Sequence, residues 1–520
     1  MTRSPDVLVI LADDLGFSDL AAFGGEISTP ALDRLARRGV RMSSFYVTPR
    51  CSPSRAALLT GRHSHEVGVG VLTSDDRPHG YRGSLDPAAP TLAERLRGAG
   101  YTTALAGKWH LSSNTSAPDE TWPTRRGFDE FYGVLPGAVS YYAPPLVDGE
   151  ERLPPSATEG DYYLTDDLTR YARGFVRRAH ASGRPWFLYL AYTAPHWPLH
   201  AREADVARYR ERYRAGWDRL RERRLARQHH LGLATAGDLP RRDPRVPAWF
   251  EARDPEWEVE RMAVYAAQVE AMDRGVGVLL DQLAAQGTLD DTLVVFCSDN
   301  GACAEELPPP SGRLPADAAP PETRDGRPVR VGNSPDVVPG PEDTYASYGR
   351  SWAHLSNTPF RMYKRWVHEG GIASPLVASW PAGGVLSGHL AGGPGHVVDI
   401  APTVLQAVGS DAAGMAGVSM LDQWRGADAV ERPLFWEHLG NAAVRYGRWK
   451  LVREAGRPWE LYDVVADRGE TRDLAGEHAD AVARLELRWN RWARSAGVIE
   501  WDRLLEYYRA RGLERSVLPD

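Results

Sequence analysis

The chain has 520 residues, a formal net charge of −7, and ordinary apolar and charged fractions of 42% and 25%. A chain of this length can bury a large core, and so small a net charge gives no reason to expect nucleic acid or an anionic membrane as a partner. Its three cysteines cannot form a disulfide framework, so we expect Cys297 and Cys303 to be reduced.

The N-terminus, MTRSPDVLVILADD, contains a short apolar run from Val7 to Ala12. This run is too short for the core of a signal peptide, and no later segment approaches the length of a membrane span. We therefore expect a cytoplasmic protein that has no membrane contact.

Several apolar runs are typical of buried parallel strands, and amphipathic segments predicted to be helices lie between them. The predicted strands are residues 6–14, 101–110, 185–198, 291–301 and 373–381, and the predicted helices are residues 29–39, 91–100 and 257–287. Thr91 and Glu94 have the spacing of a capping box. The alternation predicts an α/β fold with a large, mostly parallel sheet sandwiched by helices.

Two segments are predicted to be insertions into this pattern. Residues 200–250 are rich in arginine and indicate charged surface helices, whereas residues 305–345 are dense in proline and glycine and indicate a long loop. Near residue 433 the pattern changes to short alternating runs separated by turns, followed by an apolar-periodic helix over residues 479–496. We predict a main domain over residues 1–432 and a C-terminal α+β subdomain over residues 433–520, with a small antiparallel sheet.

Polar residues follow the predicted strands, and ligand sites of such sheets lie beyond the carboxyl ends of the strands. The residues gathered there would be Asp13, Asp14, Lys108, His110, His196, Asp299 and Asn300. Hard oxygen ligands in this number suit Ca²⁺ or Mg²⁺ and not zinc. The alternative is that Asp and Asn only cap the turns after each strand.

Cys51 lies between two arginines in the stretch PRCSPSRAALLTG, at the start of a predicted helix. A helix N-terminus and the neighbouring Arg50 and Arg55 would favour a nucleophilic thiolate, and the alternative is a buried structural cysteine. A thiol nucleophile gains nothing from a nearby site for a hard cation, so neither interpretation is complete.

Lysine occurs at only three positions, and arginine supplies every other basic side chain. Because a base-composition bias can replace lysine by arginine, the remaining lysines are candidates for positions that need a compact ammonium group. Lys108 and Lys364 lie in motifs discussed below, whereas we interpret Lys450 as structural. Four histidines near the motifs are also interpreted as packing residues: His63, His65, His200 and His368.

Four stretches resemble one known family. CSPSR matches the Cys-x-Pro-x-Arg motif of the type I sulfatases, and GYTTALAGKWHL (100–111) matches their second signature. APHWPLHA and TPFRMYKRWVHEGGIASPL (358–376) are similar to bacterial arylsulfatases. The chain therefore resembles the formylglycine-dependent sulfatases, with an alkaline-phosphatase-like fold. One departure is Arg50, where that family usually carries a small or apolar residue.

The resemblance implies that a separate maturation enzyme oxidises Cys51 to formylglycine, an aldehyde that hydrates to a gem-diol. The implied ligands of Ca²⁺, or less favourably Mg²⁺, are Asp13, Asp14, Asp299, Asn300 and an oxygen of modified Cys51. Arg55 would hold the diol and balance the carboxylates. Lys108 and His110 would contact the diol, while His196 and Lys364 would contact the sulfate ester.

The implied activity is the hydrolysis of aryl or alkyl sulfate monoesters, which are small-molecule substrates, to an alcohol and inorganic sulfate. Two alternatives remain: a phosphonate or phosphate ester hydrolase of the same superfamily, and a non-catalytic protein that binds sulfated ligands with Cys51 unmodified. Trp109, Trp197 and the tyrosines near Tyr141 are candidates to line an aryl pocket. The sequence does not set the oligomeric state.

Overall fold

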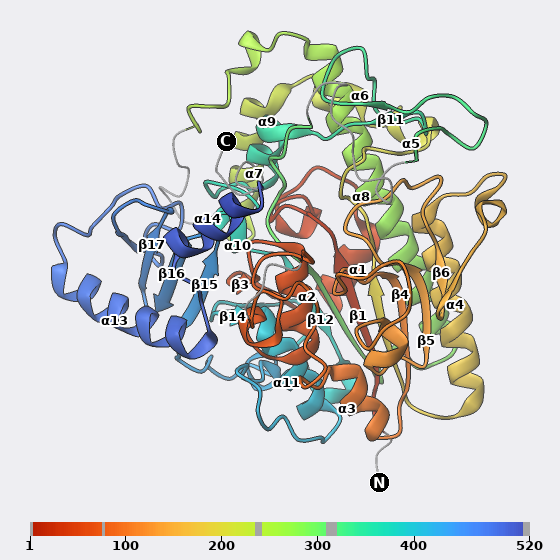
Figure 1. Cartoon of the computed structure of the whole chain (residues 1–520), viewed down its shortest axis with the longest axis horizontal. Helices are drawn as coiled ribbons and strands as arrows, with labels where there is room; N and C mark the ends of the chain where they lie inside the picture. Colours follow the sequence, from red (N-terminus) through yellow and green to blue (C-terminus); the bar gives the residue numbers. More distant parts are fainter. Residues whose placement is uncertain (1–3, 75–78, 235–241, 308–319, 513–520) are drawn as a thin grey trace.

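The computed structural model describes residues 4–74, 79–234, 242–307 and 320–512, and it is built around a ten-stranded sheet (Figure 1). In spatial order its strands are β13 (His389–Ala391), β2 (Val40–Met42), β12 (Leu376–Ser379), β9 (Thr292–Ser298), β1 (Asp6–Ala12), β8 (Trp186–Ala191), β4 (Thr102–Lys108), β5 (Glu130–Val134), β6 (Val147–Asp148) and β7 (Glu151–Arg152). The central strands β9, β1, β8, β4 and β5 are parallel, so the predicted sheet is confirmed in its main part.

The predicted parallel direction of residues 373–381 is wrong, because β12 runs antiparallel to both β9 and β2. The segment before β12 is bound to the end of β9 and to the loop after it: Ser374 Oγ accepts a hydrogen bond from Ser298 N at 2.9 Å, and Gly301 N donates to Gly371 O at 3.1 Å. The chain therefore enters β12 at the edge where β9 ends and can only run back across the sheet.

Helices cover both faces of the sheet, as the alternating pattern predicted. Leu8 and Ile10 of β1 pack into one core cluster, with helices of the first face, while Val7 and Val9 pack into a second cluster on the opposite face. The first face carries α1 (Pro30–Arg38), α4 (Leu164–Ser182) and α8 (Pro255–Ala285), and the second carries α2 (Cys51–Thr60), α3 (Leu92–Gly98), α11 (Ile400–Ala407) and α12 (Leu421–Trp424). Because β1 is buried on both sides, its sequence is a continuous apolar run.

The predicted capping box at the start of α3 is present. Thr91 Oγ1 accepts a hydrogen bond from Glu94 N at 3.0 Å, and Glu94 Oε2 accepts one from Thr91 N at 2.7 Å. Each side chain thus satisfies one backbone N–H group of the first turn.

The first insertion forms α5 (Glu203–Val206), α6 (Arg210–Tyr213) and α7 (Gly216–His230), and residues 235–241 lie outside the described part of the chain. The prediction of surface helices is wrong for the inner face of α7. Arg224 is fully buried and forms ion pairs with Asp19 at 2.7 Å and Glu26 at 2.6 Å. Arg224 points inward because the loop after β1 supplies these carboxylates, whereas the buried Arg221 donates to Pro359 O at 3.0 Å.

The described part of the second insertion is mainly loop, as predicted, and residues 308–319 lie outside it. It includes the short strands β10 (Arg330–Val331) and β11 (Thr344–Tyr345). The helices α9 (Gly349–Ser356) and α10 (Glu369–Ile372) then lead to β12, and the paired strands β3 (Phe45–Tyr46) and β14 (Gly395–His396) lie beside the main sheet.

The predicted C-terminal sheet is present as four antiparallel strands, seen beside the main sheet in Figure 1. They are β15 (Leu434–His438), β16 (Asn441–Tyr446), β17 (Trp449–Arg453) and β18 (Glu460–Asp463), and they are followed by α13 (Ala479–Ala496) and α14 (Trp501–Ala510). The domain boundary at residues 432 and 433 stays a prediction. None of the described helices is long and apolar enough to cross a membrane.

Lys450 joins this small sheet to the main domain. Its ammonium group is fully buried and donates to Glu470 at 2.7 Å and to Glu369, at the start of α10, at 3.0 Å. This arrangement agrees with the structural interpretation of Lys450.

The four histidines interpreted as packing residues also have structural partners. His65 contacts Glu437 at 2.7 Å, His200 contacts Thr344 O at 2.6 Å, His368 contacts Glu460 at 3.4 Å, and His63 packs edge-on against Trp492.

Candidate active site

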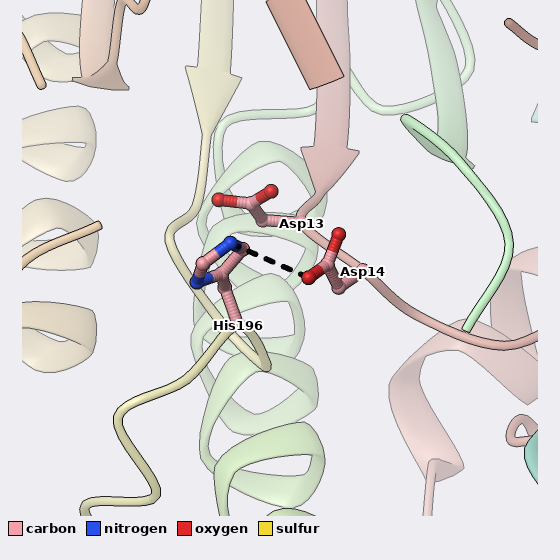
Figure 2. Close-up of side chains that lie close together, drawn as sticks. All are labelled: Asp13, Asp14 and His196. Carbon is pink, nitrogen blue, oxygen red and sulfur yellow. Dashed lines mark ion pairs between the residues drawn. The ribbon is translucent and has the colours of Figure 1, made fainter. Parts of the chain in front are cut away.

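The polar residues predicted to converge do lie together at the carboxyl edge of the sheet. Asp13 and Asp14 directly follow β1, Lys108 is the last residue of β4, and Asp299 directly follows β9. His196 belongs to the loop after β8 and reaches back so that its Nε2 lies 3.3 Å from Asp14 Oδ2 (Figure 2). The parallel order of these strands is what brings them to one edge.

Two aspartates form the negative centre of the site. Asp13 Oδ2 accepts a hydrogen bond from Lys108 Nζ at 2.6 Å, and Asp14 accepts from Lys364 Nζ at 2.9 Å and from Asn300 Nδ2 at 2.6 Å. Asp14 has a φ of 66°, a backbone conformation that non-glycine residues seldom adopt. Strain of this kind is retained where surrounding contacts fix the residue, as the lysine and the asparagine do here.

The side chains present fit a hard divalent cation. Asp13 Oδ1 and Asn300 Oδ1 are buried and accept no hydrogen bond within the described residues, which is costly for a polar atom unless a ligand satisfies it. Oxygen or nitrogen atoms of Asp13, Asp14 and His196 also lie within 4.8 Å of one another. Oxygen-rich donor sets of this type favour Ca²⁺ or Mg²⁺.

Asp299 lies beside this group with both oxygens engaged. Its Oδ1 accepts a hydrogen bond from Asp14 N at 3.2 Å, and its Oδ2 accepts from Arg55 Nη2 at 2.7 Å and Nε at 3.1 Å. The predicted metal ligands are therefore adjacent, but their ligand roles stay predictions.

Cys51 is the first residue of α2, and Arg55 lies one turn further along the same helix. Arg55 is fully buried between Asp299 and Asp13, with its Nη2 3.6 Å from Asp13 Oδ1, and its Nη1 donates to Lys108 O at 3.0 Å. The cysteine itself is 3% exposed, and its Sγ lies 3.3 Å from Nδ1 of His110. The helix therefore delivers both residues of the motif to the carboxyl edge of the sheet.

The loop that follows α9 brings Lys364 into the site. Lys364 N donates to Ala302 O at 3.0 Å and Arg365 N donates to Pro49 O at 2.7 Å, so the loop is fixed between the segments after β9 and before Cys51. The Nζ atom of Lys364 also lies 3.4 Å from Nε2 of His196.

Burial and neighbouring charge shift the pKa values of these groups in opposite directions. Burial and the nearby Asp13 raise the pKa of Asp299 to about 7. Burial would raise the pKa of Asp14 as well, but Lys364 and His196 hold it well below its usual value. Burial, together with Lys108 and Arg55, holds the pKa of His110 well below its usual value, so its imidazole is neutral near pH 7.

The same forces keep His196 neutral and Lys364 charged. Burial lowers the pKa of His196 to about 3 despite the nearby Asp14. Burial would also lower the pKa of Lys364, but Asp14 raises it well above the usual value. The Nδ1 atom of His196 lies 2.6 Å from Trp197 O, which fixes the neutral ring with its proton on Nδ1 and its lone pair on Nε2.

A cavity of about 380 Å³ opens beside this group and is lined by Cys51, His110, His196 and Lys364. Of the aromatic residues proposed for an aryl pocket, Trp197 lines the cavity. Trp109 and Tyr141 are instead buried, with their polar atoms donating to Thr121 O and to Thr193 O, respectively. Those two residues are part of the core.

Sequence reasoning missed Glu305, which also lines the cavity. It accepts hydrogen bonds from Arg50 Nη1 at 2.5 Å and from Trp197 Nε1 at 3.2 Å. The one available signal was the unusual Arg50, since a half-buried arginine at a site requires a carboxylate partner.

Comparisons with known proteins agree with this geometry. The Sulfatase family model matches residues 5–410. The chain is 34% identical to an arylsulfatase of Klebsiella aerogenes, covering 78% of this chain and 87% of the relative, and 32% identical to an uncharacterized sulfatase of Schizosaccharomyces pombe, covering 96% and 95%. The solved structure of Ps i-CgsB in complex with k-i-k-neocarrahexaose aligns with a TM-score of 0.69 at 26% identity, covering 94% of this chain and 93% of that chain.

Proposed function

Because this chain belongs to the sulfatase family of the alkaline phosphatase superfamily, and is therefore a sulfuric ester hydrolase, we propose that it hydrolyses aryl or alkyl sulfate monoesters by means of a formylglycine made from Cys51. The observation that carries this proposal is the position of Cys51. It lies at the buried start of α2, 3.3 Å from His110 and in the same cavity as His196 and Lys364.

Two groups would be supplied to the protein. Ca²⁺, held by Asp13, Asp14, Asp299 and Asn300, would offset the charge of the sulfuryl oxygens, and the hydrated aldehyde at position 51, made by a maturation enzyme of the host, would provide the attacking oxygen. The unsatisfied oxygens of Asp13 and Asn300 support the metal part of this proposal.

Arg55 and Lys108 hold the carboxylates in place. Arg55 donates two hydrogen bonds to Asp299, and Lys108 donates one to Asp13. With Lys364 on Asp14, each of the three aspartates has a cationic partner, so the site can accept an anionic ester without unbalanced negative charge.

His110 is placed to move a proton at position 51. Its Nδ1 faces the side chain of that residue, and the neutral ring has a free lone pair on one of its two nitrogens. We propose that this lone pair is on Nδ1, and that Nδ1 accepts the proton that must leave residue 51 when sulfate is expelled.

Lys364 is the group best placed to protonate the departing alcohol oxygen. The neutral His196 carries its proton on Nδ1, toward Trp197 O, so its Nε2 has none to give, whereas the ammonium of Lys364 lies 3.4 Å from that nitrogen and lines the cavity. His196 would then orient Lys364 and the ester.

Replacement of Cys51 tests this proposal. Cys51→Ala and Cys51→Ser should retain the fold, because among the described residues the thiol has a hydrogen-bond contact only with His110 and both replacements are small. Both should reduce nitrophenyl sulfate hydrolysis by at least about a thousandfold, as loss of a nucleophile does. Mass spectrometry of a peptide containing residue 51 should show formylglycine in the active protein. Full activity of Cys51→Ala would refute the proposal, and a higher efficiency with phenylphosphonate esters would favour the phosphonate alternative.

A further inference from the structure

The lining of the cavity includes an ion pair between Arg50 and Glu305. Arg50 and Glu305, whose side chains are 19% and 33% exposed, are joined at 2.5 Å. The second oxygen of Glu305 accepts from the indole N–H of Trp197 at 3.2 Å. Both oxygens of the carboxylate are therefore fixed at the surface of the cavity, and the only N–H group of the indole is used.

Glu305 is ionised in this setting. Burial would raise its pKa, but Arg50 and Lys364 hold the pKa well below its usual value. Apart from Lys364, this pair carries the only charges among the described residues that line the cavity. Besides Cys51 and the two histidines of the site, the remaining lining is apolar, including Leu72, Pro136 and Ala138, or bears uncharged hydroxyl groups.

An ion pair of this kind selects against substrates that carry a second charged group. The positive charge of Arg50 is already paired, so a second anionic group on the substrate would have to displace Glu305 or lie beside it unpaired. A neutral ring of the substrate would instead pack on the face of the Trp197 indole. The indole N–H is already bonded to Glu305, so the indole offers the substrate an apolar surface.

We propose that Glu305, positioned by Arg50 and Trp197, is a specificity-determining residue that restricts the cavity to sulfate monoesters of uncharged, flat alcohols and disfavours alcohols that carry a second anion. This inference rests on the proposed sulfatase function. It assigns to Arg50, the departure from the family pattern, the task of holding Glu305 rather than binding the ester.

The test compares two esters of similar shape, 4-carboxyphenyl sulfate and 4-carbamoylphenyl sulfate, which differ in one negative charge. We expect the isosteric Glu305→Gln to raise the ratio of kcat/KM for the carboxyl ester over the carbamoyl ester about tenfold, as removal of one fixed charge at the wall of a partly buried site does. Comparing ratios between variants cancels the different intrinsic reactivity of the two esters.

Two further variants make the prediction directional. Arg50→Met removes the ion-pair partner of Glu305 and should lower the same ratio of kcat/KM. The double variant Arg50→Met with Glu305→Gln should return the ratio to within about threefold of the wild-type value. Asp281→Asn is the matched control, since it removes a carboxylate that pairs with Arg34 at 2.7 Å on the exposed surface, and it should leave the ratio unchanged.

Binding to Cys51→Ala separates this inference from the proposed function. Calorimetric affinities of both esters should show the same change of ratio between Cys51→Ala and Cys51→Ala with Glu305→Gln. If the ratio of affinities shifts but the wild-type protein turns over neither ester, the role of Glu305 in selecting against anionic alcohols is supported and the sulfatase proposal is refuted. If the esters are turned over and the ratio is unchanged in all variants, the proposed role of Glu305 alone is refuted. If neither ester binds, the role of Glu305 and the sulfatase proposal are both refuted.

Discussion

Arg224 offers the sharpest test of how the first insertion supports the site. Its guanidinium donates to Asp19 Oδ1 at 2.7 Å and to the two oxygens of Glu26 at 2.6 and 2.8 Å, and it is fully buried. The other oxygen of Asp19 accepts from Gly16 N at 2.9 Å and from Tyr265 at 2.7 Å. Arg224 therefore balances two carboxylates in the loop that also carries Asp13 and Asp14.

The expected cost of Arg224→Met follows from this geometry. Removing one partner of a buried ion pair costs about 3–5 kcal/mol, because the remaining charge is left without compensation. Burial already raises the pKa of Asp19 even with Arg224 present, so Asp19 would take up a proton in the variant and keep the cost within this range. A loss of this size is a large part of the free energy of unfolding of a typical domain, about 5–15 kcal/mol.

Urea unfolding followed by tryptophan fluorescence measures this effect. Arg223→Met is the matched control, because Arg223 is the exposed neighbour on the same helix, and it should change the free energy of unfolding by less than about 0.5 kcal/mol. Adding Glu26→Gln to Arg224→Met should recover part of the loss, since it removes a carboxylate whose remaining cationic partner is Arg227, 3.3 Å away. If Arg224→Met shifts the unfolding midpoint no more than Arg223→Met does, the supporting role is refuted.

Three further predictions concern the stability of the C-terminal junction, its pH dependence, and the metal. Lys450→Met should lower the free energy of unfolding by about 3–5 kcal/mol, because it leaves the buried Glu470 without its cation, while Glu369 keeps Arg468 at 3.0 Å; urea midpoints should show little change for the exposed Arg448→Met. In the wild-type protein, burial would raise the pKa of Glu369, but Lys450 lowers this pKa from its usual 4.5 to about 2. Ionised Glu369 therefore stabilises the fold above pH 4.5, and urea midpoints should decline as pH falls from 4.5 toward 2 and the carboxylate is protonated. Chelation of divalent metal should lower the melting temperature, and Ca²⁺ at about a hundred times its Kd should restore about 2.7 kcal/mol; equal melting with and without metal would argue against the site.

The main sheet and the converging residues were predictable because both depend on local patterns. A strand buried on both faces must be apolar throughout, and polar residues after parallel strands must meet at one edge. Asp13 after β1 and Asp299 after β9 follow this rule directly. The direction of β12 was not predictable, because it depends on where the preceding loop is bound and not on the composition of the strand.

The contacts that sequence reasoning missed join residues far apart in the chain. Arg50 and Glu305 are 255 residues apart, and Arg224 and Asp19 are 205 residues apart. Neither pair has a periodicity or spacing that a single sequence can reveal. An arginine on a charged helix is ordinarily solvated, so the burial of Arg224 follows only from the tertiary contact.

The rarity of lysine identifies a physical environment rather than a function. Each of the three lysines is buried against carboxylates: Lys108 on Asp13, Lys364 on Asp14, and Lys450 between two glutamates. A compact ammonium can approach such oxygens from any direction, whereas a guanidinium needs a planar opening. Composition predicted positions that need a compact ammonium group, and the structure places all three in buried ion pairs. Position in the sheet distinguishes them, because two lie at the carboxyl edge, where a ligand can reach them, and the third lies at a junction between sheets.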